Sequence, residues 1–156
     1  MNKEAEKKPA LSYWQVWTDE NGTSRQTRCE IRNFEKEGMG DIEKQWNAHI
    51  MDGEAHVMFS ELPVGWEGDW HENPKPQWIV PLSGKWFVET MDGHRVEMGP
   101  GEVSFGGDQN TTEDSDGRKG HLSGTVGNEP AKLMMVQLKD KKYKAARPGD
   151  FDKENK

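Results

Sequence analysis

Short apolar segments separated by turn residues constrain this sequence more than any other feature. Each segment is five to eight residues long and rich in β-branched or aromatic side chains, and Gly, Pro, Asn or Asp stands between many of them. Helical periodicity is nearly absent, and the best helix candidate, residues 35–46, is weakened by Gly38 and Gly40. Strands at this spacing are typical of a sandwich or barrel. We therefore predict an all-β domain, with the clearest strands at residues 12–17, 27–34, 55–62, 77–83, 85–91, 94–98, 121–126 and 132–138.

The length and the distribution of charge indicate one domain with charged ends. A chain of 156 residues is typical of a single core. Aliphatic residues are scarce, but seven Trp and eight Met offset this because each Trp buries a large area. The two ends mix positive and negative charges and lack apolar runs, as solvated tails do. We expect a flexible N-terminal tail over residues 1–11, a β-barrel over 12–138 and a charged flexible C-terminal tail over 139–156.

Charge and cysteine content exclude several classes of function. The net charge of −7 argues against nucleic acid and anionic membranes as partners. No window approaches 18 consecutive apolar residues, and the first residues have no apolar signal region, so we expect a soluble cytoplasmic protein. Cys29 is the single cysteine, and neither a CxxC motif nor a predicted helix N-terminus lies beside it. This pattern favours a packed thiol over a nucleophile.

Polar side chains of one parity gather between residues 69 and 77. Asp69, His71, Asn73 and Gln77 all have odd numbers, so on an extended strand their side chains point to the same face. Prolines at 74 and 76 cannot donate ladder hydrogen bonds, which indicates an edge or a bulge within this segment. The sequence predicts a polar cluster on one face of the barrel.

The spacing around this cluster resembles the first motif of the cupin superfamily, G-x5-H-x-H-x3,4-E-x6-G. Gly65, His71, Asn73, Gln77 and Gly84 reproduce that spacing, with Asn and Gln in place of the second His and the Glu. The second cupin motif, G-x5-P-x-G-x2-H-x3-N, is matched loosely. Its first glycine corresponds to Gly101, its histidine corresponds to His121, and its final Asn is replaced by Thr125.

Four further segments, DENGTSR, PVGWEGDWHENPKPQWIVPLSG, MDGHRVEMGPGEV and GRKGHLSG, make the chain similar to a little-characterised branch of small single-domain cupins with a His, a Gln and a late His. This resemblance covers residues 13 to 138. It implies a double-stranded β-helix, or jelly-roll, barrel and a homodimer. The N-terminal strand with Trp14 and Trp17 is our candidate for the surface between the two subunits.

The resemblance implies a metal centre built from fewer strong ligands than usual. Typical cupins hold a metal with three His and one Glu, whereas here the implied ligands are His71, Gln77 and His121, all neutral. The implied cofactor is a divalent transition metal such as zinc, iron, nickel or manganese. A metal with neutral ligands keeps its full charge and favours an anionic, chelating substrate. Candidate pocket or supporting residues are His56, Asp69 and Asn73.

Two functions follow from these residues. The first is a metal-dependent enzyme acting on a small oxygenated or carboxylated metabolite by isomerase, lyase or dioxygenase chemistry. The alternative is a non-catalytic cupin whose metal-free pocket binds a small ligand for sensing or storage. The polar segment 106–120, which has no apolar side chain, is a candidate lid over the barrel mouth.

Overall fold

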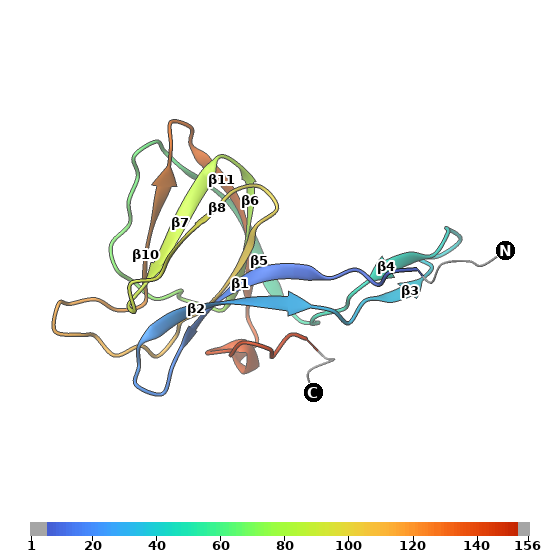
Figure 1. Cartoon of the computed structure of the whole chain (residues 1–156), viewed down its shortest axis with the longest axis horizontal. Coiled ribbons are helices and arrows are strands. Elements are labelled where there is room, and N and C mark those ends of the chain that lie inside the picture. Colours follow the sequence, from blue (N-terminus) through green and yellow to red (C-terminus); the bar gives the residue numbers. More distant parts are fainter. Residues whose placement is uncertain (1–5, 153–156) are drawn as a thin grey trace.

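The computed structural model describes residues 6–152 and consists mainly of β-strands and the loops that join them (Figure 1). The one helix among these residues is a single 3-10 turn, η1 (Lys141–Tyr143). The strands are β1 (Leu11–Thr18), β2 (Ser24–Ile31), β3 (Glu35–Glu37), β4 (Gln45–Asn47), β5 (Ala55–Leu62), β6 (Gln77–Ser83), β7 (Lys85–Thr90), β8 (Arg95–Met98), β9 (Val103–Gly107), β10 (His121–Val126) and β11 (Ala131–Leu138). The predicted all-β fold class is confirmed.

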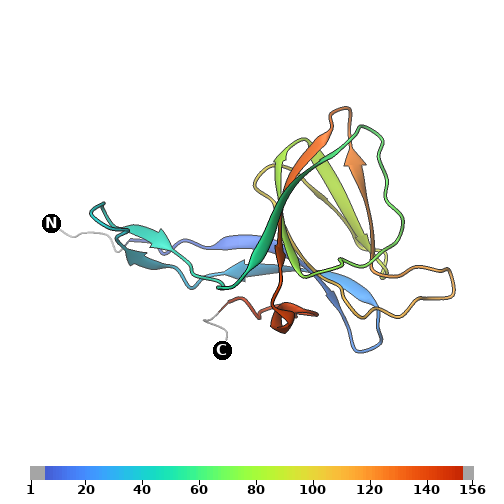
Figure 2. The same ribbon diagram turned by 180° about the vertical axis from the view of Figure 1, so that it is seen from behind.

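Two sheets face each other and enclose the barrel (Figures 1 and 2). The larger sheet has the strand order β2-β1-β9-β6-β11-β5, and the smaller has the order β10-β7-β8. Isolated bridges from Glu67 to Gly124 and from His71 to His121 place the 67–71 segment along the free edge of β10. All pairings are antiparallel except that between β1 and β9. The bridge at His71 and His121 is the structural basis of the candidate site described below.

The inner core fills the space between the two sheets. Alternate residues of the strands point inward, so that β6 contributes Ile79, β7 contributes Trp86 and Val88, and β8 contributes Met98. Burying a side chain of this size contributes about 1.5–3 kcal/mol. The remaining members are Val16, Val96, Ala131 and Leu133. This inner core closes one end of the cavity that holds the candidate site.

A second core lies on the outer face of the larger sheet, under the C-terminal segment. Phe151 is 4% exposed. Its ring centroid lies 4.6 Å from that of Phe105 and 5.3 Å from that of Trp78. Gln15 also donates to the Ala146 carbonyl from inside this core. Residues 139–152 are therefore a packed part of the fold, which corrects the prediction of a flexible tail there. The end of that predicted tail, 153–156, and residues 1–5 of the predicted N-terminal tail lie outside the described residues.

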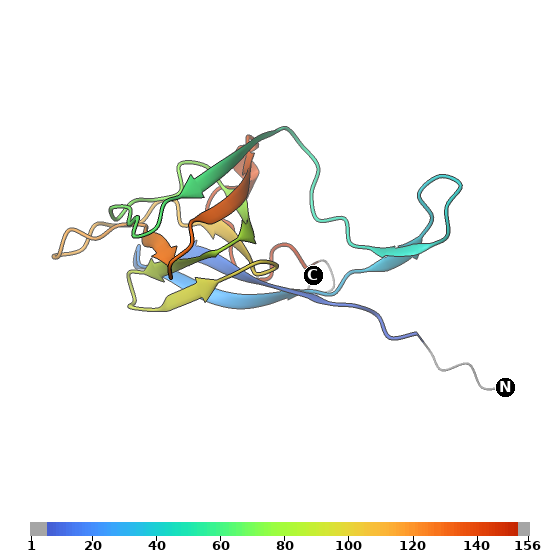
Figure 3. The same cartoon turned by 90° about the horizontal axis from the view of Figure 1, so that it is seen from above.

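The segment between β2 and β5 forms an arm that projects away from the barrel (Figure 3). Its two short strands, β3 and β4, pair antiparallel with Lys36 opposite Trp46. Residues 35–46, the weak helix candidate of the sequence, are not helical and form this hairpin instead. Gly40 adopts a φ of +68° in the turn between the strands, a conformation that an α-helix does not contain.

The Trp side chains of β1 have partners within the chain. Trp14 packs against the inner core, and its ring lies 5.6 Å from that of His94. Trp17 donates its indole N–H to the Thr27 hydroxyl at 2.9 Å. Trp14 and Trp17 therefore do not need a second subunit to cover them. The predicted homodimer stays a prediction. Within residues 6–152, no helix is long and apolar enough to cross a membrane.

Candidate functional site

A cavity of about 270 Å³ opens at one end of the barrel, between the larger sheet and the 66–74 segment. Four of its polar lining residues come from the sequence motif or its resemblance: His71, Asn73, Gln77 and His121. Three of the four odd-numbered polar residues, His71, Asn73 and Gln77, therefore line one cavity, with a bend of the chain at residues 74–75 between them, whereas Asp69 is not part of the lining. The apolar part of the lining consists of Met58, Leu62, Trp66, Pro74, Ile79, Trp86, Leu133 and Met135.

A backbone bridge brings His71 and His121 together. The N–H of each donates to the carbonyl of the other, at 3.0 and 2.9 Å, and the ring centroids lie 4.7 Å apart. Gly120 makes this approach possible. It has a φ of +63°, and a Cβ at this position would lie 2.1 Å from the His71 carbonyl oxygen. A glycine before His121 is therefore required by the bridge itself.

His121 is anchored by a buried carboxylate, Asp108. The His121 Nδ1 lies 2.7 Å from the Asp108 Oδ2, and the two residues are 4% and 0% exposed. Burial raises the pKa of Asp108, but its interaction with His121 and the hydrogen bonds from the Asn73 N–H groups outweigh burial and hold that pKa below its ordinary range. An ionised Asp108 accepts the Nδ1–H of His121, which leaves Nε2 for a ligand in the cavity.

His71 is anchored in the same way, by a different kind of acceptor. Its Nδ1 lies 2.6 Å from the main-chain carbonyl oxygen of Asp69. A carbonyl oxygen only accepts, so the Nδ1 of His71 carries the proton and Nε2 holds the lone pair. The sequence proposed that the Asp69 side chain supports a histidine. The structure assigns this contact to the Asp69 backbone instead.

Three amide side chains continue the network behind the histidines. Asn73 donates from Nδ2 to Asp108 at 2.6 Å and accepts from the Gln77 Nε2 at 2.5 Å. The Gln77 Oε1 accepts in turn from the Nε2 of Gln137 on β11, at 3.0 Å. Gly106 leaves room for this chain of bonds, because a Cβ there would lie 2.3 Å from the Asn73 side chain. Gln77 therefore has hydrogen-bond partners at both ends of its amide.

The other candidate histidine does not join the cluster. His56 lies on β5 opposite Gln137, but it is exposed and does not line the cavity. His94, which the sequence did not select, is an exposed residue against Trp14, and His49 contacts Glu37 on the arm. The two imidazoles of the cavity are those at 71 and 121.

Two residues of the site were missed by sequence reasoning. Asp108 stands at the start of the long polar segment, which was interpreted as a whole, although it directly follows a strand. Part of that segment, Asp108 and Gln109, is buried beneath the site, so it does not act there as a lid. Gln137 is the single amide in the otherwise mostly apolar strand KLMMVQL, and this feature could have marked it as a candidate site residue.

The donors that this cavity offers a divalent metal are its two imidazoles. Each ring has one nitrogen held by an oxygen acceptor and the other left for the cavity, which is the arrangement that orients metal-binding histidines. Asp108 supplies the negative charge that the neutral ligands lack. The third donor is weaker, because the Gln77 Oε1 already accepts a hydrogen bond. No group of three or more His, Cys, Asp or Glu side chains able to hold a metal is found in the described part of the chain.

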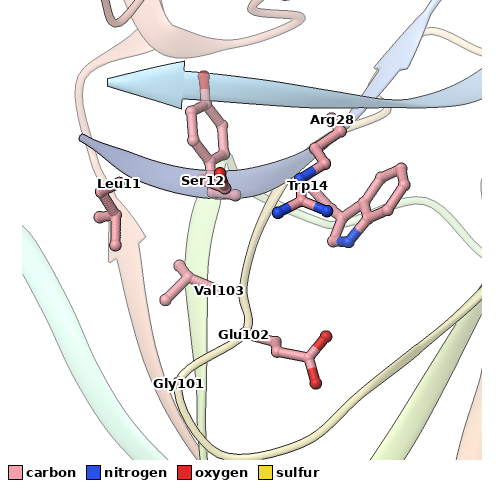
Figure 4. A pocket seen from close by; sticks show the side chains of 8 residues that line it. Leu11, Ser12, Trp14, Arg28, Gly101, Glu102 and Val103 are labelled. Carbon is pink, nitrogen blue, oxygen red and sulfur yellow. The ribbon is translucent and has the colours of Figure 1, made fainter. Parts of the chain in front are cut away.

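A second cavity, of about 260 Å³, lies elsewhere on the barrel, beside the start of β1 (Figure 4). Its charged residues are Arg28 and Glu102, and the Trp14 ring stands next to Arg28. It contains no histidine and no buried carboxylate, so it lacks the donor atoms of the first cavity. The His71 and His121 cavity is the candidate functional site.

Comparisons with known proteins find similarity in structure alone. No protein-family model matches the sequence, and no curated protein matches it. The matched structures include a cupin-2 domain protein from Shewanella frigidimarina (14% identity, 63% of this chain and 85% of that chain, TM-score 0.40). A cupin superfamily protein from Desulfitobacterium hafniense matches at 14% identity over 60% of this chain and 75% of that chain, with a TM-score of 0.40. The Cnp3 cupin domain of Schizosaccharomyces pombe matches at 16% identity over 83% and 88%, with a TM-score of 0.41. The chain is an all-β barrel, and these solved structures to which it is similar are cupin proteins.

Proposed function

We propose that the barrel binds a divalent transition metal through the Nε2 atoms of His71 and His121 and acts on a small oxygenated or carboxylated metabolite. One observation carries this proposal. Both imidazoles of the cavity have Nδ1 held by an oxygen acceptor, and their rings lie 4.7 Å apart. Two such nitrogen lone pairs beside one cavity form a site for a cation or a hydrogen-bond donor.

The chain's own residues orient the site and set its charge. Asp108 accepts a hydrogen bond from the Nδ1–H of His121 and so fixes the direction of the ring. Asn73 holds Asp108 in place with its backbone and side-chain N–H groups. Because Asp108 is ionised and fully buried, it favours a cation at the neighbouring Nε2. Gln77 lies beside the pair as a neutral third donor. The apolar walls formed by Ile79, Trp86 and their neighbours suit the carbon body of a small metabolite.

His71 and His121 would hold the metal, which would supply Lewis-acid chemistry toward a carbonyl or carboxylate oxygen of the substrate. This fits isomerase, lyase or dioxygenase chemistry without choosing between them. The candidate ions are zinc, iron, nickel and manganese. A cytoplasmic location and a homodimeric state remain predictions alongside this function.

The test is metal content in the purified protein and in matched variants. Elemental analysis after reconstitution is expected to give about one equivalent of metal in the wild type and a large loss in His71→Ala and in His121→Ala. His94→Ala is the control, because His94 is exposed and does not line the cavity. Less than about 0.1 equivalent in the wild type overturns the proposal, and full metal in either cavity variant overturns the ligand assignment.

A second candidate is a metal-free pocket that binds a small ligand. The observation that favours it is the Gln77 amide, which has a partner at each end and would have to share Oε1 with a metal. In that case His71 and His121 accept hydrogen bonds from a hydroxyl or ammonium group of the ligand. Binding of such a ligand to protein with no metal, lost in His121→Ala, would favour this candidate.

A further inference from the structure

A half-buried threonine, Thr111, connects the two segments that carry the histidines of the cavity. Its hydroxyl donates to the Glu72 Oε1 at 2.6 Å and accepts from the Gly120 N–H at 3.0 Å. Its backbone N–H donates to the same Glu72 oxygen at 2.7 Å. Glu72 directly follows His71, and Gly120 directly precedes His121. These bonds therefore lie one residue from each histidine. We call Glu72, Thr111 and Gly120 the clamp.

The Thr111 hydroxyl has a role in the clamp that no other group of these three residues can take. A carboxylate accepts hydrogen bonds and a backbone N–H donates them, whereas a hydroxyl does both. The hydroxyl therefore makes one bond to Glu72 and one from Gly120. Without it, the N–H of Gly120, a buried residue, loses its acceptor, and Glu72 keeps one of its two bonds to Thr111.

Gly120 is also attached to the body of the barrel, through Ser24 at the start of β2. The Ser24 hydroxyl, which is fully buried, donates to the Gly120 carbonyl at 2.5 Å and accepts from the Met91 N–H at 2.8 Å. This contact holds Gly120 but does not involve the segment that carries His71. Thr111 is therefore the side chain that ties Gly120 to that segment, in addition to the backbone bridge between the histidines.

The clamp lies at the base of the loop 112–119, which projects from the barrel (Figures 1 and 2). The outer part of this loop is held by its own contacts. The Asp114 Oδ1 accepts from the backbone N–H groups of Asp116 and Arg118, and its Oδ2 accepts from the Arg118 Nε at 2.8 Å. Because these bonds do not pass through Thr111, the shape of the loop tip does not require the clamp.

We propose that Thr111 and Glu72 are positioning residues, which hold His71 and His121 side by side with both Nε2 atoms toward the cavity. Neither Thr111 nor Glu72 lines the cavity, so both act through the segments that carry the imidazoles. Their effect on the backbone bridge needs no ligand. Their effect on metal binding rests on the function proposed above, because two imidazoles bind one ion only when the rings are held in a fixed arrangement.

Amide hydrogen exchange of the metal-free protein, measured by NMR, tests the positioning. The N–H groups of His71 and His121 form the bridge, and this bridge is isolated from the ladders of the sheets. It therefore opens without global unfolding, and a general loss of stability does not by itself speed its exchange. Thr111→Val is expected to speed the exchange of the two amides about 10-fold, because it removes the hydroxyl and keeps the shape. Thr111→Ser keeps the hydroxyl and should exchange as the wild type does.

Thr112→Val is the matched control, because Thr112 is exposed and its bond to Gly22 uses the backbone N–H, which valine keeps. Glu72→Gln and Glu72→Ala test the other half of the clamp. Glutamine keeps the Oε1 acceptor, so only the alanine variant should exchange faster than the wild type. Wild-type exchange of the two bridge amides in Thr111→Val, or the same acceleration in Thr112→Val, overturns the proposal. Wild-type exchange in Glu72→Ala overturns the role of Glu72.

Calorimetric titration with Zn²⁺ tests the consequence for the site. The affinity of Thr111→Val is expected to fall about 10-fold, and that of Thr111→Ser to stay at the wild-type value. Wild-type affinity in Thr111→Val overturns the role of the clamp in metal binding. A wild type that does not bind Zn²⁺ contradicts the proposed function instead, and the exchange rates of the metal-free protein then decide whether the clamp positions the histidines.

Discussion

The Nδ1 of His121 and the Oδ2 of Asp108 are 2.7 Å apart behind the lining of the cavity, and neither residue is more than 4% exposed. A buried carboxylate in this position fixes the ring tautomer and direction, and it places a negative charge behind the nitrogen that faces the ligand. The site therefore does not present three neutral ligands alone. Its negative charge comes from Asp108, which lies behind His121 and is not part of the sequence motif.

Asp108→Asn is expected to weaken metal binding without emptying the cavity. The amide keeps much of the shape but removes the charge, and its NH₂ group cannot accept the Nδ1 proton of His121. Loss of such support typically lowers metal affinity by about 10–100-fold. Calorimetric titration with Zn²⁺ measures the change. Asp116→Asn is the control, because Asp116 belongs to the same segment but its side chain is 77% exposed. Equal affinities in wild type and Asp108→Asn would contradict the role of Asp108.

The parts of the fold that follow from local pattern were predictable, and those that depend on long-range packing were not. Alternation placed His71, Asn73 and Gln77 on one face, and turn residues marked the strands. The C-terminal segment was interpreted as a tail because its many charges conceal Phe151, the residue that packs under the sheet. Asp108 was missed because its position directly after a strand is the only local difference between this buried carboxylate and the solvated ones that follow it.

The arm shows a different limit of sequence reasoning. Residues 35–46 contain good helix formers such as Glu and Lys, but pairing between Lys36 and Trp46 and the turn at Gly40 outweigh that weak preference. Charged residues occur in both helices and exposed hairpins, so their helix propensities do not determine the structure of this segment.

Gly120→Ala is expected to separate the two histidines. The new methyl group would overlap the His71 carbonyl, and the left-handed backbone adds strain, so we expect a loss of about 2–4 kcal/mol in the free energy of unfolding. Gly117→Ala is a matched control: its φ is +76°, but the nearest atom to a Cβ there is 3.9 Å away. Urea denaturation of both variants isolates the cost of the contact with His71. Equal losses would mean that backbone strain alone accounts for the effect.

Gln77→Glu is expected to lower the stability of the metal-free protein and to raise its affinity for a metal. A carboxylate cannot donate to the Asn73 Oδ1, so the metal-free variant should unfold at a lower temperature than the wild type. The same carboxylate is a better metal ligand than an amide, so added Zn²⁺ should raise the melting temperature more in the variant. Differential scanning calorimetry with and without Zn²⁺ measures both effects. A variant that gains no more from Zn²⁺ than the wild type would argue against a metal beside Gln77.

Asp19→Asn is expected to remove part of the acid sensitivity of the fold. The Arg25 Nε donates to the Asp19 Oδ2 at 2.7 Å, and the N–H groups of Asn21 and Thr23 donate to Oδ1. The Arg25 hydrogen bond holds the pKa of Asp19 below its ordinary range, against burial, which raises it. A carboxyl with a lowered pKa stabilises the folded state fully above its unfolded pKa of about 3.9 and loses that contribution as the pH falls through the folded value. The wild type should therefore exceed Asp19→Asn in free energy of unfolding at pH 7, and the difference should shrink below about pH 4. Urea titrations at a series of pH values measure this difference, and a gap that stays constant down to pH 2.5 would show that Asp19 does not stabilise the β1–β2 turn through its charge.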